Sequence, residues 1–269
     1  MDLSNDNVIH CKKDDIEYLQ FRRLLEYEDN IKHAFSLGIN YDFRISNKMT
    51  EEQQEHNKAC YKNICKYIGI NYTDIVKPNQ VHKDRIKNIE KKVNEYAPDF
   101  LEEAYKETDG LITNKSNIAI CTTNADCIGL MMYDNVKKVI ANIHSGWRGT
   151  VQRIGAKTID KMQEIYGCKP KDIICCITPS IRQCHFEVDN DVKEIFENNF
   201  KNLQSFMLKQ EKWHIDTVKL NIEMLKEKGL RKENIIDSKI CTVCNSRSIH
   251  SYRGSNHNNG LEMGIIELK

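Results

Sequence analysis

The amino-acid sequence predicts an α/β fold, a single-domain layered α/β sandwich with mixed sheets. Two observations predict it. Apolar runs of strand length alternate with amphipathic helical segments, and the predicted strands are joined both by short polar breaks and by helical crossovers. Short breaks give antiparallel hairpins and crossover helices give parallel neighbours, so we expect both kinds of pairing. With 269 residues, no low-complexity linker and no internal repeat, the chain is expected to form one domain over residues 1–269.

The expected elements follow one another in a regular order. Residues 1–50 show little periodicity and are expected to be irregular, whereas Glu51–Ile68 has the apolar spacing of a helix. A later helix is expected to begin with Thr150 as its N-cap and to end before Gly167. The other expected helices are residues 189–200 and 216–228, and the expected strands are residues 74–77, 118–121, 128–133, 138–144, 173–178, 235–241 and 264–268.

Charge and composition narrow the function. The positive charges of 40 Lys and Arg residues nearly cancel the negative charges of 39 Asp and Glu residues. The protein therefore lacks the broad positive electrostatic field that would indicate nucleic acid as a partner. The longest apolar runs fall far short of the roughly 20 residues of a membrane span, and no signal peptide is visible. Eleven cysteines without an export signal are expected to be mostly free thiols in a reducing cytoplasm. We therefore expect a cytoplasmic protein that binds neither nucleic acid nor membrane.

The most informative pair of residues is Cys127 and His144, which end and begin the strings NADC and HSGWRGT. The segment between them has two apolar runs separated by a short polar break, as in a β-hairpin. If Asn135 and Val136 form a two-residue loop, residue 127 lies opposite residue 144, with Cβ atoms roughly 4.5–5.5 Å apart. A slip of one residue would place the two side chains on opposite faces.

A thiol and an imidazole held together can do two kinds of chemistry. With His82, at the end of NQVH, they make a three-ligand set for zinc that leaves a fourth position for water or substrate, and copper would also bind such a set. Nothing local places His82 near the pair, and alone it would be typical of a surface loop. In the alternative, Cys127 is the nucleophile and His144 the base of a hydrolase or deamidase. A zinc-stabilised binding domain is disfavoured, because structural zinc usually has four protein ligands.

Two further motifs carry weaker signals. In HSGWRGT, a glycine-containing loop leads into the expected helix, whose N-terminus together with Arg148 would suit an anion. Equally, Gly146 and Gly149 would simply form a tight turn. The pair Cys241 and Cys244 has the spacing of half a zinc ribbon, but no second CxxC pair exists, so we expect free thiols there.

Several strings together resemble the laccase-domain family of YfiH-like proteins, which are also called multicopper polyphenol oxidases and purine nucleoside phosphorylases. The resemblance covers roughly residues 78–269 and leaves residues 1–75 as the less typical part. The strings that carry it, in the family's order, are QVH, TDGLITN, ADC, HSGWRGT, PSI, FEV, CT and HSYR.

The resemblance implies a YfiH-like fold and a metal held by His82, Cys127 and His144. It also implies zinc-dependent phosphorolysis of adenosine, inosine, guanosine and methylthioadenosine, with adenosine deamination as a second activity. Purine nucleosides and phosphate are then the expected partners, and the protein is expected to be a monomer or a small homo-oligomer.

The chain departs from the family pattern at Lys83, Thr178, His250 and Leu261, the last of which stands where an arginine is usual. The oxidase name is also in conflict with the sequence. Multicopper oxidases use many histidines in HxH pairs, whereas this chain has nine histidines and no such pair. We therefore expect copper-dependent polyphenol oxidation to be no more than an alternative to nucleoside chemistry.

The remaining site residues are predicted from their places in these strings. For phosphorolysis, phosphate held by Arg148 and the helix N-terminus would attack the ribose C1′ atom. The motifs of the well-known zinc deaminases are absent. Asp126 and Glu187 are the carboxylates expected to contact substrate or move protons, with His185 as an alternative. The predicted catalytic residues are Cys127, His144, Asp126, Glu187 and Arg148, and the predicted substrate contacts are Gln80, Ser145, Gly146, Arg148 and Arg253.

Overall fold

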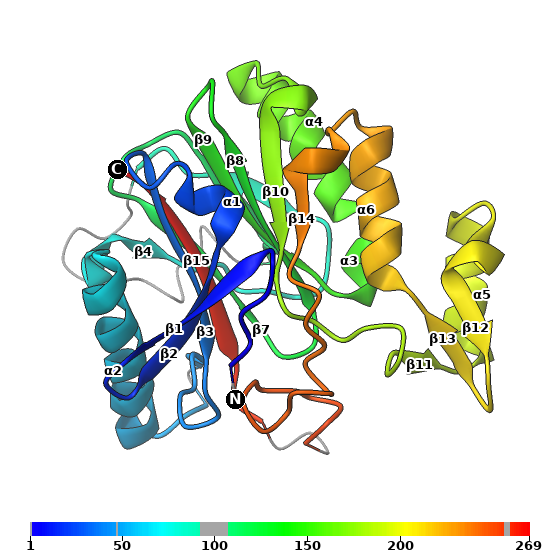
Figure 1. Cartoon of the computed structure of the whole chain (residues 1–269), viewed down its shortest axis with the longest axis horizontal. Helices are drawn as coiled ribbons and strands as arrows, with labels where there is room; N and C mark the ends of the chain where they lie inside the picture. Colours follow the sequence, from blue (N-terminus) through cyan, green and yellow to red (C-terminus); the bar gives the residue numbers. More distant parts are fainter. Residues whose placement is uncertain (1, 47, 92–106, 256–258) are drawn as a thin grey trace.

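The computed structural model describes residues 2–46, 48–91, 107–255 and 259–269 of the chain. Two six-stranded sheets pack face to face, and helices cover their outer faces (Figure 1). Both sheets contain parallel and antiparallel pairs. The expected α/β layered sandwich with mixed sheets is therefore confirmed.

The first sheet joins the two ends of the chain, because the last strand lies between the third and the seventh. The expectation that residues 1–50 are irregular was wrong, since three strands of this sheet come from there. Polar residues interrupt the apolar pattern of these strands. His33, for example, is buried in the third strand, where its ring accepts a hydrogen bond from the N–H of Phe21 at 2.8 Å. In sheet order the strands are β1 (Val8–Lys13), β2 (Ile16–Phe21), β3 (Ile31–Leu37), β15 (Glu262–Leu268), β7 (Ala119–Asn124) and β4 (Ile75–Val76).

The second sheet contains the hairpin predicted around residues 128–144. In sheet order its strands are β14 (Ile235–Asp237), β10 (Ile173–Ile177), β8 (Ile128–Asp134), β9 (Val139–Ser145), β6 (Gly110–Thr113) and β5 (Ile86–Asn88). A small third sheet at the edge of the molecule has the order β11 (Glu187–Val188), β13 (Trp213–Ile215) and β12 (Met207–Lys209) (Figure 1).

The register of the hairpin differs from the prediction. Gly129, not Cys127, pairs with His144, and the loop has four residues between Asp134 and Val139. The Asp134 carboxylate accepts two loop N–H groups, and the loop starts at Asn135 as expected but ends two residues later, before Val139. Because the pairing moved by two positions, Cys127 stays diagonal to His144 and not on the opposite face.

In the described part of the chain, six α-helices complete the layers. The predicted helix α2 (Glu51–Ile68) is confirmed residue for residue, and Thr50 and Gln53 form a capping box at its start. It covers the first sheet, whereas α4 (Ile154–Tyr166) and α6 (Thr217–Glu227) cover the second. The others are α1 (Arg22–Leu25), α3 (Trp147–Val151) and α5 (Asn190–Asn199). Among the described residues, no helix is both long and apolar enough to cross a membrane.

The helix expected to begin at Thr150 is in fact two helices. Helix α3 begins at Trp147 with Gly146 as its N-cap, and Arg153 breaks the chain in the left-handed region at φ 60° before α4 begins. Thr150 is not a cap, because its hydroxyl is buried and accepts the side-chain amide of Asn221 at 2.9 Å. The short α3 ties the end of β9 to the helical layer.

One buried carboxyl makes the stability of this fold depend on pH. Burial raises the pKa of Glu262 to about 8, although Ser36 and the N–H of His250 donate to its oxygens. Between about pH 4.5 and pH 8 the unfolded chain therefore loses a proton that the folded chain keeps. The sign follows: this group costs stability progressively as pH rises through that window.

Glu262→Gln should remove this loss, because the neutral amide resembles the protonated carboxyl. We expect urea unfolding midpoints, measured from pH 5 to pH 8.5, to fall less steeply with pH in the variant than in the wild type. The exposed Glu233→Gln serves as the control. Parallel pH profiles for Glu262→Gln and the wild type would contradict this account.

Candidate active site

A single buried carboxylate brings the distant parts of the site together. Asp109 directly precedes β6 and is 0% exposed. Its two oxygens accept the successive N–H groups of Val81, His82 and Lys83 at 2.9–3.2 Å, and the Nδ1–H of His144 at 2.8 Å. Burial opposes the ionisation of Asp109, but these hydrogen bonds outweigh it and lower its pKa. This contact explains how a loop histidine reaches the hairpin.

The three predicted metal ligands lie together. The ligand atoms of His82, Cys127 and His144 all lie within 4.8 Å of one another. The two imidazole rings meet edge to face with their centroids 4.7 Å apart. His144 is buried, Cys127 is half-buried and His82 is exposed, so the cluster opens to solvent on the His82 side.

The charges within this cluster favour a thiolate. Burial raises the pKa of Cys127, but the two neighbouring histidines outweigh it and lower the pKa to about 6. Burial likewise works against the His144 imidazolium, but Cys127 and Asp109 raise the pKa of His144 to about 9. The thiolate is the form of cysteine that binds metals and attacks electrophiles.

The residues present fit a metal ion such as zinc. Thiolate and imidazole are donors that zinc prefers, and catalytic zinc sites have three protein ligands and keep a fourth position open. Asp109 holds the second nitrogen of His144, as carboxylates commonly do for metal-binding histidines. There is also no room for a side chain at Gly146 beside the ligands, because a Cβ atom there would lie 3.0 Å from the His82 ring and 3.1 Å from the Cys127 sulfur.

The cluster lies in a cavity of about 890 Å³, within the usual size range of small-molecule sites. Four cationic side chains contribute to its lining. Lys77 is buried, and desolvation lowers its pKa. Arg148 is exposed and lies over the Trp147 ring at 4.3 Å. The other two are Arg44 and Arg253. Four carboxylates also line the cavity, so these cations offer local binding points for an anionic group within a lining of mixed charge.

Four of the five residues predicted to contact substrate line this cavity, and Gly146 does not. Several of the five have structural partners. Gln80 bonds twice to the backbone of Thr123, as a neighbouring strand would. Ser145 is buried, and its hydroxyl contacts Thr150. Gly146 caps α3, which has only five residues.

Asp126 and Glu187 also line the cavity, in different settings. Asp126 is buried, and both of its oxygens accept hydrogen bonds: from the hydroxyls of Thr242 and Ser251 at 2.5 and 2.7 Å, and from the N–H of Arg253 at 2.7 Å. Glu187 is exposed, and its carboxylate lies 3.7 Å from the Arg253 guanidinium.

Sequence reasoning missed three residues of the site. Asp109 stands in TDGLITN, a string that pointed to the family without suggesting a role. Arg44 comes from the segment expected to be irregular, and its guanidinium donates to the carbonyl of Asn259 at 2.6 Å. It therefore reaches the loop in which Leu261 replaces the usual arginine. Lys77 ended a predicted strand, and nothing in its spacing distinguished it.

The fold and the site define an α/β protein with a metal-competent His₂Cys cluster, and proteins of known structure share its fold. The solved structure of the hypothetical protein YfiH from Bacillus licheniformis has a TM-score of 0.82 over 94% of this chain and 96% of that one, at 23% identity. YlmD from Geobacillus stearothermophilus has the same TM-score at 17% identity, over 97% of this chain and 99% of that one. At these identities, the two structures show the fold.

Sequence comparison places the chain more closely. Residues 37–269 match the family described as multi-copper polyphenol oxidoreductase laccase, and the chain belongs to this family. It is 32% identical over 196 residues to adenosine deaminase RL5 of an unknown prokaryotic organism, covering 72% of this chain and 74% of that protein. It is 30% identical over 193 residues to purine nucleoside phosphorylase YlmD of Bacillus subtilis, covering 71% of this chain and 69% of that protein. The predicted family is therefore confirmed.

Asp109→Asn tests whether this carboxylate organises the ligands. One amide nitrogen would then face N–H donors, so the 81–83 loop and His144 should lose their common anchor. We expect zinc affinity at the His82–Cys127–His144 cluster to fall by about 10–100-fold, measured by competition with a chelator. The control is Asp84→Asn, which removes a surface ion pair with Lys157 near the same loop. Unchanged affinity in Asp109→Asn would contradict the assignment.

Proposed function

We propose that this protein is a zinc-dependent purine nucleoside phosphorylase acting on adenosine, inosine, guanosine and methylthioadenosine, with adenosine deamination as a second, hydrolytic activity. The observation that carries the proposal is the His82–Cys127–His144 cluster inside a cavity whose lining includes four cationic side chains. The names of two relatives, a purine nucleoside phosphorylase and an adenosine deaminase, support the same reading. We further propose that residues 1–269 form one catalytic domain, because β15 lies between β3 and β7.

His82, Cys127 and His144 would hold the metal. When bound there, a zinc ion supplies a Lewis acid with one coordination position free for a ligand. Asp109 fixes the tautomer and the orientation of His144, because its oxygen accepts a hydrogen bond from Nδ1–H and leaves Nε2 for the metal.

The cationic side chains would bind phosphate. The Lys77 ammonium is a compact charge in the buried part of the cavity lining. The planar guanidinium of Arg148, at the start of α3, can donate two parallel hydrogen bonds. In phosphorolysis a phosphate oxygen forms a bond to the ribose C1′ atom while the C1′–N bond breaks and its electron pair goes to the base. These two cations would lower the cost of bringing phosphate into the cavity and orient it for this attack.

The purine would lie against the apolar part of the lining. Phe186 and Val188 come from the start of the small sheet, and Trp147 from α3. Aromatic faces favour stacking with a planar base. Glu187, between the two apolar residues, is the carboxylate that we assign to proton transfer to the leaving base, because its side chain is exposed at the cavity.

Asp126 has a different part in this proposal. Its oxygens are occupied by Thr242, Ser251 and the backbone of Arg253, so it positions the loop that carries Arg253 and does not itself exchange protons. Arg253 in turn donates to the carbonyls of His185 and Glu187. The Asp126 carboxylate thereby helps to fix the wall of the cavity that carries Phe186 and Val188.

The two alternatives are less well supported. Copper-dependent oxidation needs several coppers, and neither of the two candidate metal clusters found among the described residues contains more than two histidines. A Cys–His hydrolase is favoured by one observation, the lowered pKa of Cys127 beside His144. Bound zinc would suppress that chemistry by occupying the thiolate, so metal content separates the two readings.

Product analysis with adenosine tests the proposed function. Purified protein of known metal content is incubated with adenosine, with and without phosphate, and the products are separated. We expect adenine and ribose 1-phosphate only with phosphate, a smaller amount of inosine in both buffers, and loss of all products in Cys127→Ala. Cys11→Ser, a half-buried cysteine outside the site, should retain the wild-type rates.

Other outcomes would revise or overturn the proposal. Inosine as the main product in both buffers would make deamination the primary reaction. Metal-free protein whose Cys127 is alkylated rapidly, and which does not act on adenosine, would favour the hydrolase. Full activity of Cys127→Ala would exclude the cluster from catalysis.

A further inference from the structure

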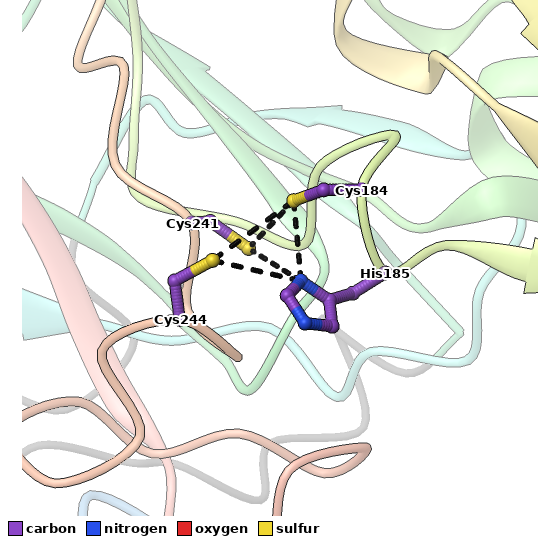
Figure 2. Close-up of side chains that lie close together, drawn as sticks. All are labelled: Cys184, His185, Cys241 and Cys244. Carbon is purple, nitrogen blue, oxygen red and sulfur yellow. Dashed lines mark hydrogen bonds between the residues drawn. The ribbon is translucent and has the colours of Figure 1, made fainter.

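A second group of metal-binding side chains lies outside the cluster described above. Cys184 and His185 belong to the loop between β10 and β11, and Cys241 and Cys244 to the segment after β14. Figure 2 shows the three sulfurs and the His185 ring turned toward one common point. Nothing in the proposed nucleoside reaction uses these four residues.

The distances within this group are those of a tetrahedral metal site. The Cys184 sulfur lies 3.7 Å from that of Cys241 and 4.0 Å from that of Cys244. His185 Nδ1 lies 3.1 Å from the Cys184 sulfur and 3.6 Å from each of the other two. Zinc bonded to sulfur at about 2.3 Å and to nitrogen at about 2.0–2.1 Å would set its ligands roughly 3.8 Å apart for two sulfurs and roughly 3.5 Å for sulfur and nitrogen.

The same distances exclude a disulfide in this structure. A disulfide needs about 2.05 Å between sulfurs, and all eleven cysteines of the chain are free. Packing alone explains the group poorly, because Cys184 and Cys244 are exposed and an apolar core would not hold them. Two segments about 57 residues apart in the chain place four soft donors around one point.

We propose that Cys184, His185, Cys241 and Cys244 form a structural zinc site. The set Cys₃His with four protein ligands is typical of closed zinc sites that stabilise a fold, whereas the His82–Cys127–His144 cluster has the three ligands of a site that remains open. Thiolate-rich sets select zinc over magnesium and calcium, which prefer oxygen. On binding, each thiol releases its proton and the sulfur donates an electron pair to the metal.

The zinc would fasten together the two loops that build one wall of the cavity. Without it they are joined by the bridge between Ser180 and Cys241, in which the N–H of Thr242 donates to the Ser180 carbonyl at 3.1 Å. Arg253 also donates to the His185 carbonyl at 3.1 Å. A metal ion between the loops would thus fix the backbone from which Phe186, Glu187 and Arg253 face the cavity.

The proposed site would revise two sequence expectations. The Cys241–Cys244 pair was expected to be free thiols because no second CxxC pair exists, but the partners are the adjacent residues Cys184 and His185. His185 was expected to be an alternative acid or base, whereas its Nδ1 faces three sulfurs. The proposal is independent of the reaction at the first cluster, since metal content is measured without any substrate.

Metal counting by native mass spectrometry tests the proposal on protein purified with zinc and without chelator. We expect two zinc ions per chain in the wild type and one in Cys127→Ala, retained at the second site. Cys244→Ser should also hold one, and the double variant none. Cys11→Ser should hold two. A Cys127→Ala protein without zinc, or a Cys244→Ser protein with two ions, would overturn the proposal.

Alkylation of the wild type gives a readout that does not depend on the folding of a variant. Peptide mapping should show Cys184 and Cys244 protected in zinc-loaded protein despite their exposure, and modified at least tenfold faster after a chelator removes the metal. Equal rates with and without zinc would contradict the site. So would a disulfide among these cysteines in protein kept reduced and zinc-loaded.

Discussion

The site depends on one interaction, the set of hydrogen bonds that the Asp109 carboxylate accepts. A fully buried carboxylate is costly unless donors surround it, and here three consecutive backbone N–H groups and one imidazole do so. The cost of leaving any of these groups unpaired makes the arrangement specific. A short loop that has no secondary structure of its own is thereby held against the hairpin, and His82 is brought to Cys127 and His144.

The rest of the fold holds the hairpin that carries His144 in a fixed position. β8 and β9 are buried along their whole length between the other sheet and the helices, so the hairpin cannot change register without exposing its apolar residues. Asp126, the residue before Cys127, has a similar role, because it accepts hydrogen bonds from residues of the segment 242–253. Two buried carboxylates therefore connect the region of the hairpin to loops that line the cavity.

The sequence predicted the layers, most of the helices and the three residues of the His82–Cys127–His144 cluster, because these leave local signals: apolar periodicity, caps and rare motifs. The sequence-based predictions failed where tertiary contacts determine the structure. The register of the hairpin depends on the way Asp134 bonds to its own loop, and β3 was hidden by a histidine that is buried but hydrogen-bonded. Asp109 had no signal beyond its motif, and the four ligands around Cys184 come from segments whose proximity only the fold creates.

The most direct measurement is anomalous diffraction at the zinc absorption edge, from crystals of the wild-type protein grown with zinc. The account predicts a strong peak among His82, Cys127 and His144, with the Asp109 carboxylate still bonded to His144 and to the backbone of residues 81–83. The absence of a peak there in zinc-loaded crystals, with His82 turned away from Cys127, would contradict the claim that Asp109 assembles a metal centre from these three residues.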